Sequence, residues 1–274
     1  MSPLVTPAEL DALLGRVTVL DVRYRMGGPG GVAVYVEGHV PHALYVDLDT
    51  ALAAPPGERG RHPLPDPEAF GAAMRSVGVF AERPVVVYDD WEGRAAARCW
   101  WLLKHHGHPD VRVLDGGWSA WVAAGGEVED GMRLPHTGDF QPGPGVLPVI
   151  ETDEVLAFAD RRVLIDARNA DRYAGETEPV DPVAGHVPGA LNVPTGTNLR
   201  VDGSFRSGTE IAALYQAAGV ASGAEVGVYC GSGVTATHDI LALAHAGIEA
   251  ALYPGSWSEW VADPSRPVAT GHQP

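Results

Sequence analysis

Apolar residues along this chain follow helical spacing in some segments and form continuous runs in others. Near the start, Thr6-Pro7-Ala8-Glu9 has the form of a capping box, which begins a helix. Leu10, Leu13 and Leu14 then fall on one face of that helix. The next run, Val17-Thr18-Val19-Leu20-Asp21, is continuous and ends in a polar residue, as a short buried strand does. The pattern predicts a helix followed by a strand.

The order of strand, loop and helix is predicted at two further places. Val85-Val86-Val87-Tyr88 and Val226-Gly227-Val228-Tyr229 are continuous apolar runs of strand length, and helical patterns follow them at 95–106 and 235–246. Because strands alternate with helices, we expect an α/β fold with mostly parallel sheets flanked by helices on both faces. Ligands bind at the carboxyl ends of the strands in such sheets.

Two stretches of the chain are nearly the same. Leu114-Asp115-Gly116-Gly117-Trp118-Ser119-Ala120-Trp121-Val122 returns as Tyr253-Pro254-Gly255-Ser256-Trp257-Ser258-Glu259-Trp260-Val261. Other landmarks recur in the same order, which makes a chance match improbable: Asp21-Val22-Arg23 with Asp166-Ala167-Arg168, and Gly38-His39-Val40-Pro41 with Gly185-His186-Val187-Pro188. Internal repetition at this length predicts two tandem domains.

We place the domain boundary in the segment 127–148, which is rich in Gly, Pro and charge. The expected domains are 1–140 and 141–274. Arg23 and Arg168 each follow an aspartate at a strand end, and their repetition in both halves indicates that they are structural partners of Asp21 and Asp166. The tryptophans of the repeated motif are expected to be framework residues for the same reason.

Composition narrows the range of functions. With 274 residues and 45% apolar content, the chain can build two ordinary cores. A formal net charge of −16 without a basic cluster excludes nucleic acid and anionic membrane surfaces as partners. The segment Met1-Ser2-Pro3-Leu4-Val5-Thr6 has no basic start followed by an apolar run, so we expect a soluble protein in the cytoplasm. Two cysteines form neither a disulfide framework nor a metal-ligand pair.

The candidate chemistry centres on Cys230, in Cys230-Gly231-Ser232-Gly233-Val234-Thr235-Ala236 between a predicted strand and a predicted helix. Loop amides and the helix N-terminus converge there, which favours the thiolate, a strong nucleophile. Gly231 and Gly233 permit the positive φ angles of a tight loop, and the Ser232 hydroxyl can donate to the sulfur or relay a proton. The alternative is a buried structural cysteine in a turn.

The matching place in the first half, Asp89-Asp90-Trp91-Glu92-Gly93-Arg94, has no cysteine, so we expect domain 1–140 to be inactive and domain 141–274 to be catalytic. Cys99 lies in a helical pattern and is expected to be a packed residue. His105, His106 and His108 flank Gly107 at a predicted helix end, where imidazole suits the helix dipole. We therefore predict no metal and no cofactor.

The Cys-Gly-Ser-Gly-Val-Thr-Ala loop, the Gly-Ser-Trp-Ser-Glu-Trp motif and the paired Gly-His-Val-Pro segments resemble the tandem-domain rhodaneses over nearly the whole chain. Within them the neutral loop resembles that of 3-mercaptopyruvate sulfurtransferases, whereas thiosulfate-preferring members carry basic residues after the cysteine. The resemblance implies that Cys230 takes the outer sulfur of a small anionic donor as a persulfide. The sulfur then passes to cyanide or to a thiol acceptor of the thioredoxin kind.

The resemblance also implies roles for other positions. Arg172, in Asp171-Arg172-Tyr173, matches the arginine that grips the donor's anionic group. Asp49 matches the acid of a catalytic triad with Cys230 and Ser232, and His62 matches a histidine of an interdomain site. The further donor-binding residues expected from the loop are Gly231, Gly233, Val234 and Thr235.

One position departs from the pattern of the mercaptopyruvate enzymes. These enzymes usually have a second arginine shortly after a Glu-Pro pair, where Glu178-Pro179-Val180-Asp181 has an aspartate. Mercaptopyruvate thus loses one carboxylate contact, while the loop offers no cationic side chain to the dianion thiosulfate. The neutral loop, as the more direct determinant, favours mercaptopyruvate.

Two other classes of function also place a cysteine in such a loop. A cysteine phosphatase needs an arginine six residues after its cysteine, where this chain has Ala236, so the loop does not suit phosphate esters. A sulfur carrier that delivers its persulfide to one protein partner without turnover fits the same loop, and the sequence leaves it open.

Overall fold

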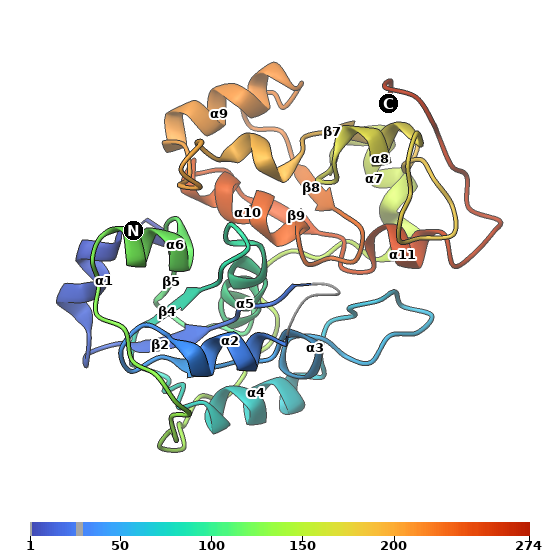
Figure 1. Cartoon of the computed structure of the whole chain (residues 1–274). Coiled ribbons are helices and arrows are strands. Elements are labelled where there is room, and N and C mark those ends of the chain that lie inside the picture. Colours follow the sequence, from blue (N-terminus) through green and yellow to red (C-terminus); the bar gives the residue numbers. More distant parts are fainter. Residues whose placement is uncertain (1, 26–29) are drawn as a thin grey trace. The chain divides into compact units, whose positions relative to one another are not determined.

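The computed structural model describes residues 2–25 and 30–274 (Figure 1). By its internal contacts the chain forms two compact units. The first comprises Met1–Ala54, Leu64–Leu147 and Val201–Phe205, and the second comprises Pro55–Pro63, Pro148–Arg200 and Arg206–Pro274. The short segment Pro55–Pro63, although it lies in the first half of the sequence, therefore belongs to the second unit.

The first unit contains a five-stranded sheet in the order β1-β5-β4-β2-β3, with every pairing parallel. Its strands are β1 Leu4–Val5, β2 Thr18–Asp21, β3 Leu44–Tyr45, β4 Val85–Tyr88 and β5 Val111–Leu114. The flanking helices are α1 Pro7–Leu13, α2 Gly31–Glu37, α3 Leu48–Ala51, α4 Pro67–Ser76, α5 Arg94–His105 and α6 Gly117–Ala123. The predicted capping box is present, since the side chains of Thr6 and Glu9 bond each other's backbone amides.

The second unit contains a four-stranded parallel sheet in the order β7-β6-β8-β9. Its strands are β6 Val163–Asp166, β7 Leu191–Asn192, β8 Val226–Tyr229 and β9 Ala250–Leu252. The helical segments are η1 Thr152–Glu154, α7 Val155–Arg161, α8 Ala170–Ala174, η2 Thr195–Asn198, α9 Gly208–Ala217, α10 Ala236–His245 and α11 Ser256–Trp260. The predicted α/β class with parallel sheets and flanking helices is confirmed.

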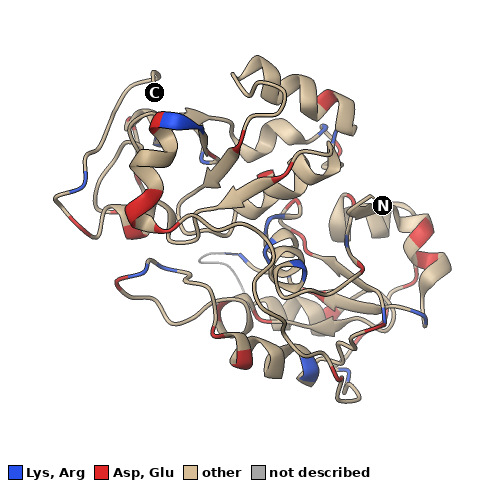
Figure 2. Cartoon of the chain, turned by 180° about the vertical axis from the view of Figure 1, so that it is seen from behind, with Lys and Arg blue, Asp and Glu red and all other residues tan. Residues whose placement is uncertain are grey.

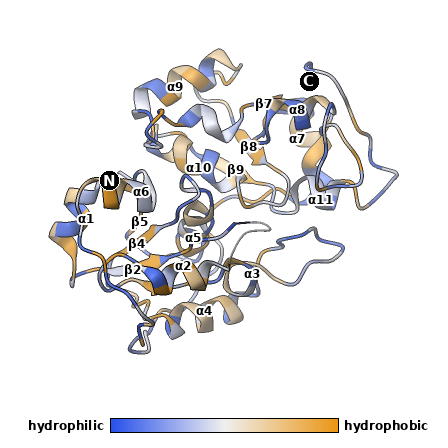
Figure 3. Ribbon diagram, viewed as in Figure 1, coloured by the Kyte–Doolittle hydropathy of each residue, from blue (hydrophilic) through white to orange (hydrophobic). Residues whose placement is uncertain are grey.

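Each unit has its own apolar core. Every residue of β2, β4 and β8 is buried, and Figure 3 shows hydrophobic residues along β4 and β8. Glycine occupies position 227 within β8 because a Cβ there would lie 2.4 Å from Ile150 and 2.8 Å from Phe158. The central strands are thus buried on both faces, as parallel strands between helices must be.

Buried arginines tie the strand ends to neighbouring loops in the same way in both units. Arg23 pairs with Asp21 at 2.7 Å, donates to the Gly38 carbonyl and lies 4.8 Å from the Trp118 ring centre. Arg168 repeats the arrangement: it pairs with Asp166 at 2.6 Å, donates to Gly185 and lies 4.6 Å from Trp257. The prediction that these arginines are structural partners of the aspartates is confirmed.

Charged residues of both signs are interspersed over both units (Figure 2). Within the described ranges, none of the helices combines the length and the apolar character needed to cross a membrane.

Loss of the buried arginine in the first unit is expected to be costly. Arg23→Ala leaves the Asp21 carboxylate buried without its cationic partner, which should lower the free energy of unfolding by about 3–5 kcal/mol. Arg25 pairs with Asp90 from a side chain that is 56% exposed, so Arg25→Ala should cost no more than about 1 kcal/mol. Urea unfolding of both variants checks this, and equal losses would contradict a special role for the buried pair.

Candidate active site

Cys230 lies directly after β8, and its backbone is bonded by the first two residues of α11. The Cys230 amide donates to Ser256 Oγ at 3.1 Å, and Ser256 Oγ in turn donates to the Tyr253 carbonyl. The Cys230 carbonyl accepts from the Trp257 amide at 2.9 Å. The sulfur accepts from the Gly233 amide at 3.2 Å, and the residue is only 1% exposed. The thiol therefore lies in a loop with the Gly233 N–H group directed at its sulfur.

The two loop glycines are required for different reasons. Gly233 has a φ of 76°, and a Cβ there would lie 2.2 Å from the Pro254 carbonyl oxygen, so both conformation and space require glycine. Gly231 does not have a positive φ, which corrects the expectation for that position. A Cβ on Gly231 would instead lie 3.0 Å from Arg61 Nη2 and 3.6 Å from Arg172 Nη1. Gly231 thus leaves space beneath two guanidinium groups.

The remaining loop residues form the turn that enters α10. Val234 is buried, and its carbonyl accepts hydrogen bonds from the amide and hydroxyl of Thr237. The carbonyl of Thr235, the residue before the helix, accepts from the His238 amide. Through these hydrogen bonds Val234 and Thr235 help to fix the conformation of the loop. Donor binding by these two residues stays a prediction.

Ser232 and His62 are brought together. His62 Nδ1 and Ser232 Oγ share a hydrogen bond of 2.8 Å, and His62 reaches the loop from the segment Pro55–Pro63. When Nδ1 carries no proton, the hydroxyl donates to it, and the pair can then move a proton next to Cys230.

Asp49 lies on α3 in the first unit, with an exposed side chain. Cys230 and Ser232 belong to the second unit. The triad expected from the resemblance stays a prediction for this aspartate.

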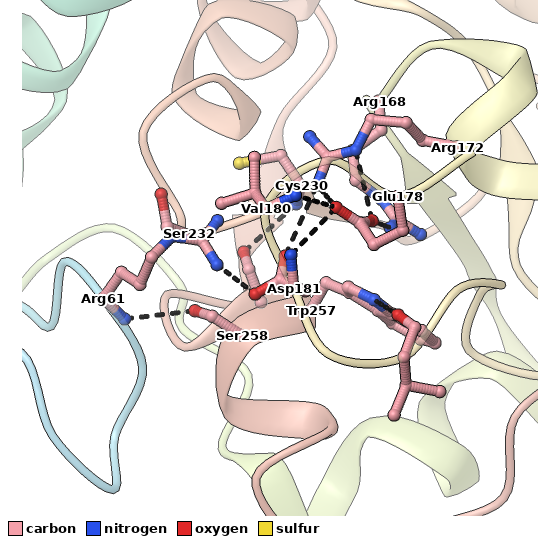
Figure 4. A network of polar contacts seen from close by, with 12 residues as sticks. Arg61, Arg168, Arg172, Glu178, Val180, Asp181, Cys230, Ser232, Trp257 and Ser258 are labelled. Atoms are coloured by element: carbon pink, nitrogen blue, oxygen red, sulfur yellow. Dashed lines mark hydrogen bonds and ion pairs between the residues drawn. The ribbon is translucent and has the colours of Figure 1, made fainter. Parts of the chain in front are cut away.

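A network of three arginines and two carboxylates lies beside the cysteine loop (Figure 4). Arg172 grips Glu178 with Nε at 3.2 Å and Nη2 at 2.6 Å, and its Nη2 is 3.4 Å from Asp181. Asp181 also pairs with Arg61 Nη1, and the Arg61 amide donates to Ser258 Oγ. Glu178 accepts further bonds from the Val180 and Asp181 amides and from Arg168.

The two carboxylates differ in how the protein affects their ionisation. Burial by itself would raise the pKa of Glu178, but the hydrogen bonds from Arg172 and from the Asp181 and Val180 amides outweigh it, so the net pKa is lowered. Burial raises the pKa of Asp181, and the attraction of Arg61 offsets this only in part. The protein thus favours the charged form of Glu178 and disfavours the charged form of Asp181.

Arg61 and the role of Asp181 as its counterion were not identified from the sequence. The available signal was that Arg61 directly precedes His62, a candidate site residue. The contact joins positions far apart in the chain, and no local pattern marks such a pairing.

Asp89 occupies in the first unit the place that Cys230 has in the second. Its carbonyl accepts from the Trp118 amide at 2.8 Å, just as that of Cys230 accepts from Trp257. The buried Asp89 carboxylate accepts hydrogen bonds from the amides of Trp91, Gly93 and Ala96, each at 2.8 Å. This loop therefore uses its amides to hold its own side chain.

Other candidate groups have structural contacts. Cys99 is fully buried on α5, where burial raises the pKa of its thiol. His105 stacks on Trp101 with ring centres 4.5 Å apart, His106 contacts the Gly143 carbonyl and His108 the Phe80 carbonyl. Among the described residues, no three His, Cys, Asp or Glu side chains are arranged to hold a metal ion.

The fold and the site together define a duplicated α/β protein with one amide-lined cysteine loop. The family model for the rhodanese-like domain matches the chain twice, at residues 6–124 and 151–263. The chain belongs to the rhodanese-like family, as its sequence motifs predicted.

Several relatives and solved structures are similar over most of the chain. A protein of Mycobacterium tuberculosis provisionally named thiosulfate sulfurtransferase SseB is 44% identical over 98% of this chain and 97% of its own length. The 3-mercaptopyruvate sulfurtransferase of Escherichia coli is 36% identical over 92% of both chains. The structure of 3-mercaptopyruvate sulfurtransferase from Leishmania major aligns with a TM-score of 0.84 and 33% identity, covering 94% of this chain and 74% of that one.

Removing the charge of Glu178 should destabilise the second unit in a pH-dependent way. Because its pKa is lower in the folded state than the ordinary 4.5, the stabilisation is complete above pH 4.5 and is lost as pH falls through the folded pKa. Glu178→Gln should therefore lower the melting temperature at neutral pH, and the difference from the native protein should shrink at about pH 4.

The matched control is Glu176→Gln, whose side chain is 61% exposed. It should change the melting temperature little at either pH. A Glu178→Gln difference that stays constant or grows on acidification would contradict the assignment of Glu178 as an ionised counterion.

Proposed function

We propose that this protein is a sulfurtransferase in which Cys230 takes a sulfane sulfur from a small anionic donor and passes it to an acceptor. The observation that carries the proposal is the Cys230 sulfur, which accepts a hydrogen bond from the Gly233 amide at the carboxyl end of β8. The guanidinium of Arg172 lies next to the same loop. The names of the relatives, which include both thiosulfate and 3-mercaptopyruvate sulfurtransferases, support this activity.

With mercaptopyruvate, the Cys230 thiolate attacks the donor sulfur and forms an S–S bond while the donor's C–S bond breaks. The electrons of that bond pass to the carbon as the enolate of pyruvate. The thiol proton of the donor ends on this carbon, which gives pyruvate and an anionic persulfide. With thiosulfate, the same attack on the outer sulfur releases sulfite and moves no proton.

Two sets of groups assist this step. We propose that the Ser232–His62 pair, which shares a hydrogen bond, carries the proton that mercaptopyruvate must transfer from sulfur to carbon. The Gly233 amide, which bonds the sulfur of the free thiol, supports the negative charge of the persulfide. We propose that Asp49 acts with Cys230 and Ser232 as the resemblance implies.

We propose 3-mercaptopyruvate as the preferred donor. The side chains after the cysteine, Gly231 and Ser232, are neutral and offer no positive charge to the dianion thiosulfate. Arg172 is held by Glu178 through Nε and Nη2, and its Nη1 and Nη2 atoms lie next to Gly231, where N–H groups of a guanidinium suit the carboxylate of a keto acid.

In the second half-reaction an acceptor attacks the outer persulfide sulfur and restores the Cys230 thiolate. A thiol acceptor leaves as its own persulfide, and cyanide leaves as thiocyanate. We propose a thioredoxin-like dithiol in the cytoplasm as the physiological acceptor. Domain 1–140 would take no part as a nucleophile, because Asp89 stands where the thiol would be.

Replacing the nucleophile should abolish turnover. Cys230→Ser is expected to leave no sulfur transfer to cyanide or dithiothreitol above the uncatalysed rate, while circular dichroism stays native. Cys99→Ser is the control and should keep its activity, because Cys99 is a packed helix residue. Residual turnover by Cys230→Ser would rule out the mechanism.

Truncating Arg172 should weaken donor binding. A charge-assisted contact is worth about 1.5–3 kcal/mol, so Arg172→Ala should raise the donor KM by about tenfold or more. Arg200→Ala, which removes an exposed pair with Glu210, should leave KM unchanged. An unchanged KM in Arg172→Ala would remove this arginine from the donor site.

A further inference from the structure

Arg61 reaches the cysteine loop from outside the sequence of the catalytic repeat. Its segment, Pro55–Pro63, is part of the second unit and is anchored there by the bond from the Arg61 amide to Ser258 Oγ at 3.1 Å. The guanidinium lies above Gly231, the residue after the nucleophile, where Nη2 would be 3.0 Å from an added Cβ. Two arginines, Arg61 and Arg172, thus approach Gly231.

Asp181, which stands where the mercaptopyruvate enzymes usually have a second arginine, has a specific partner. Asp181 is buried and pairs with Arg61 Nη1, and it also lies 3.4 Å from Arg172. This position therefore carries a carboxylate that holds the guanidinium of Arg61, a residue of the segment Pro55–Pro63.

The geometry points to Arg61 as a second donor-binding residue that replaces the missing arginine, with Asp181 as its positioning residue. The donor it selects is a small molecule with a planar carboxylate. This inference rests on the proposed sulfur transfer, which supplies the reason for a donor at Gly231.

The charges of the network explain why a carboxylate is selected. Arg61 and Arg172 are balanced by Asp181 and Glu178, so the network adds N–H groups in fixed directions and little net positive charge. The side chains of Arg61 and Arg172 remain 29% and 19% exposed. Directed donors without net charge favour a planar monoanion over the tetrahedral dianion thiosulfate.

The test compares Arg61→Ala with Arg59→Ala, an exposed arginine of the same segment. Steady-state kinetics with each donor should show that Arg61→Ala raises the KM for mercaptopyruvate about tenfold or more. The KM for thiosulfate should rise less, and Arg59→Ala should change neither. Arg61→Lys keeps the charge without the fork and should give an intermediate KM, which also covers the case in which the alanine variant fails to fold.

A KM for mercaptopyruvate that stays within about twofold of the native value in Arg61→Ala would overturn the inference. So would equal increases for both donors, because they would indicate a general loss of charge or structure.

A binding measurement separates this inference from the proposed function. Pyruvate can be titrated by ligand-observed NMR into the Cys230→Ser protein, with and without Arg61→Ala. Saturable binding that weakens in the double variant supports the carboxylate site even if the native protein accepts no sulfur from either donor. Absence of saturable binding to Cys230→Ser, or equal binding to both proteins, would overturn it.

Discussion

The side chain of Arg168 connects the carboxyl end of β6 to three other parts of the second unit. It pairs with Asp166, donates to the Gly185 carbonyl, and packs against Trp257, whose amide holds the Cys230 carbonyl. It also contacts Glu178, which in turn fixes Arg172. Because a buried charge must keep its partners, this one ion pair constrains both the backbone of the cysteine loop and the anion-binding groups beside it.

The duplication shows which parts of the scaffold are independent of the chemistry. The first unit has the same aspartate–arginine pair and the same bond from a tryptophan amide to the residue after the central strand. There the loop amides surround the Asp89 carboxylate, which is covalently part of the loop. In the second unit the sulfur of the smaller Cys230 side chain accepts a hydrogen bond from the Gly233 amide. The same amide can stabilise the anion of the proposed persulfide without a change in the loop backbone.

Sequence reasoning succeeded where the determinants were local or repeated. Continuous apolar runs predicted the central strands, the capping box predicted α1, and the recurrence of Asp21-Val22-Arg23 predicted that each arginine is a structural partner of its aspartate. It failed for Gly231, where the structure shows a need for space beneath Arg61 in place of a positive φ. The pairing of Arg61 with Asp181 was missed because only the folded chain brings Pro55–Pro63 to the second unit.

The central claim is that Cys230 accepts and holds one sulfur atom. The most direct measurement is to incubate the reduced protein with 3-mercaptopyruvate or thiosulfate in separate samples, remove the excess donor, and determine the intact mass and the modified peptide. The account predicts one added sulfur, located on Cys230, with faster loading from mercaptopyruvate. A protein that gains no sulfur from either donor, or gains it at Cys99, would contradict the account.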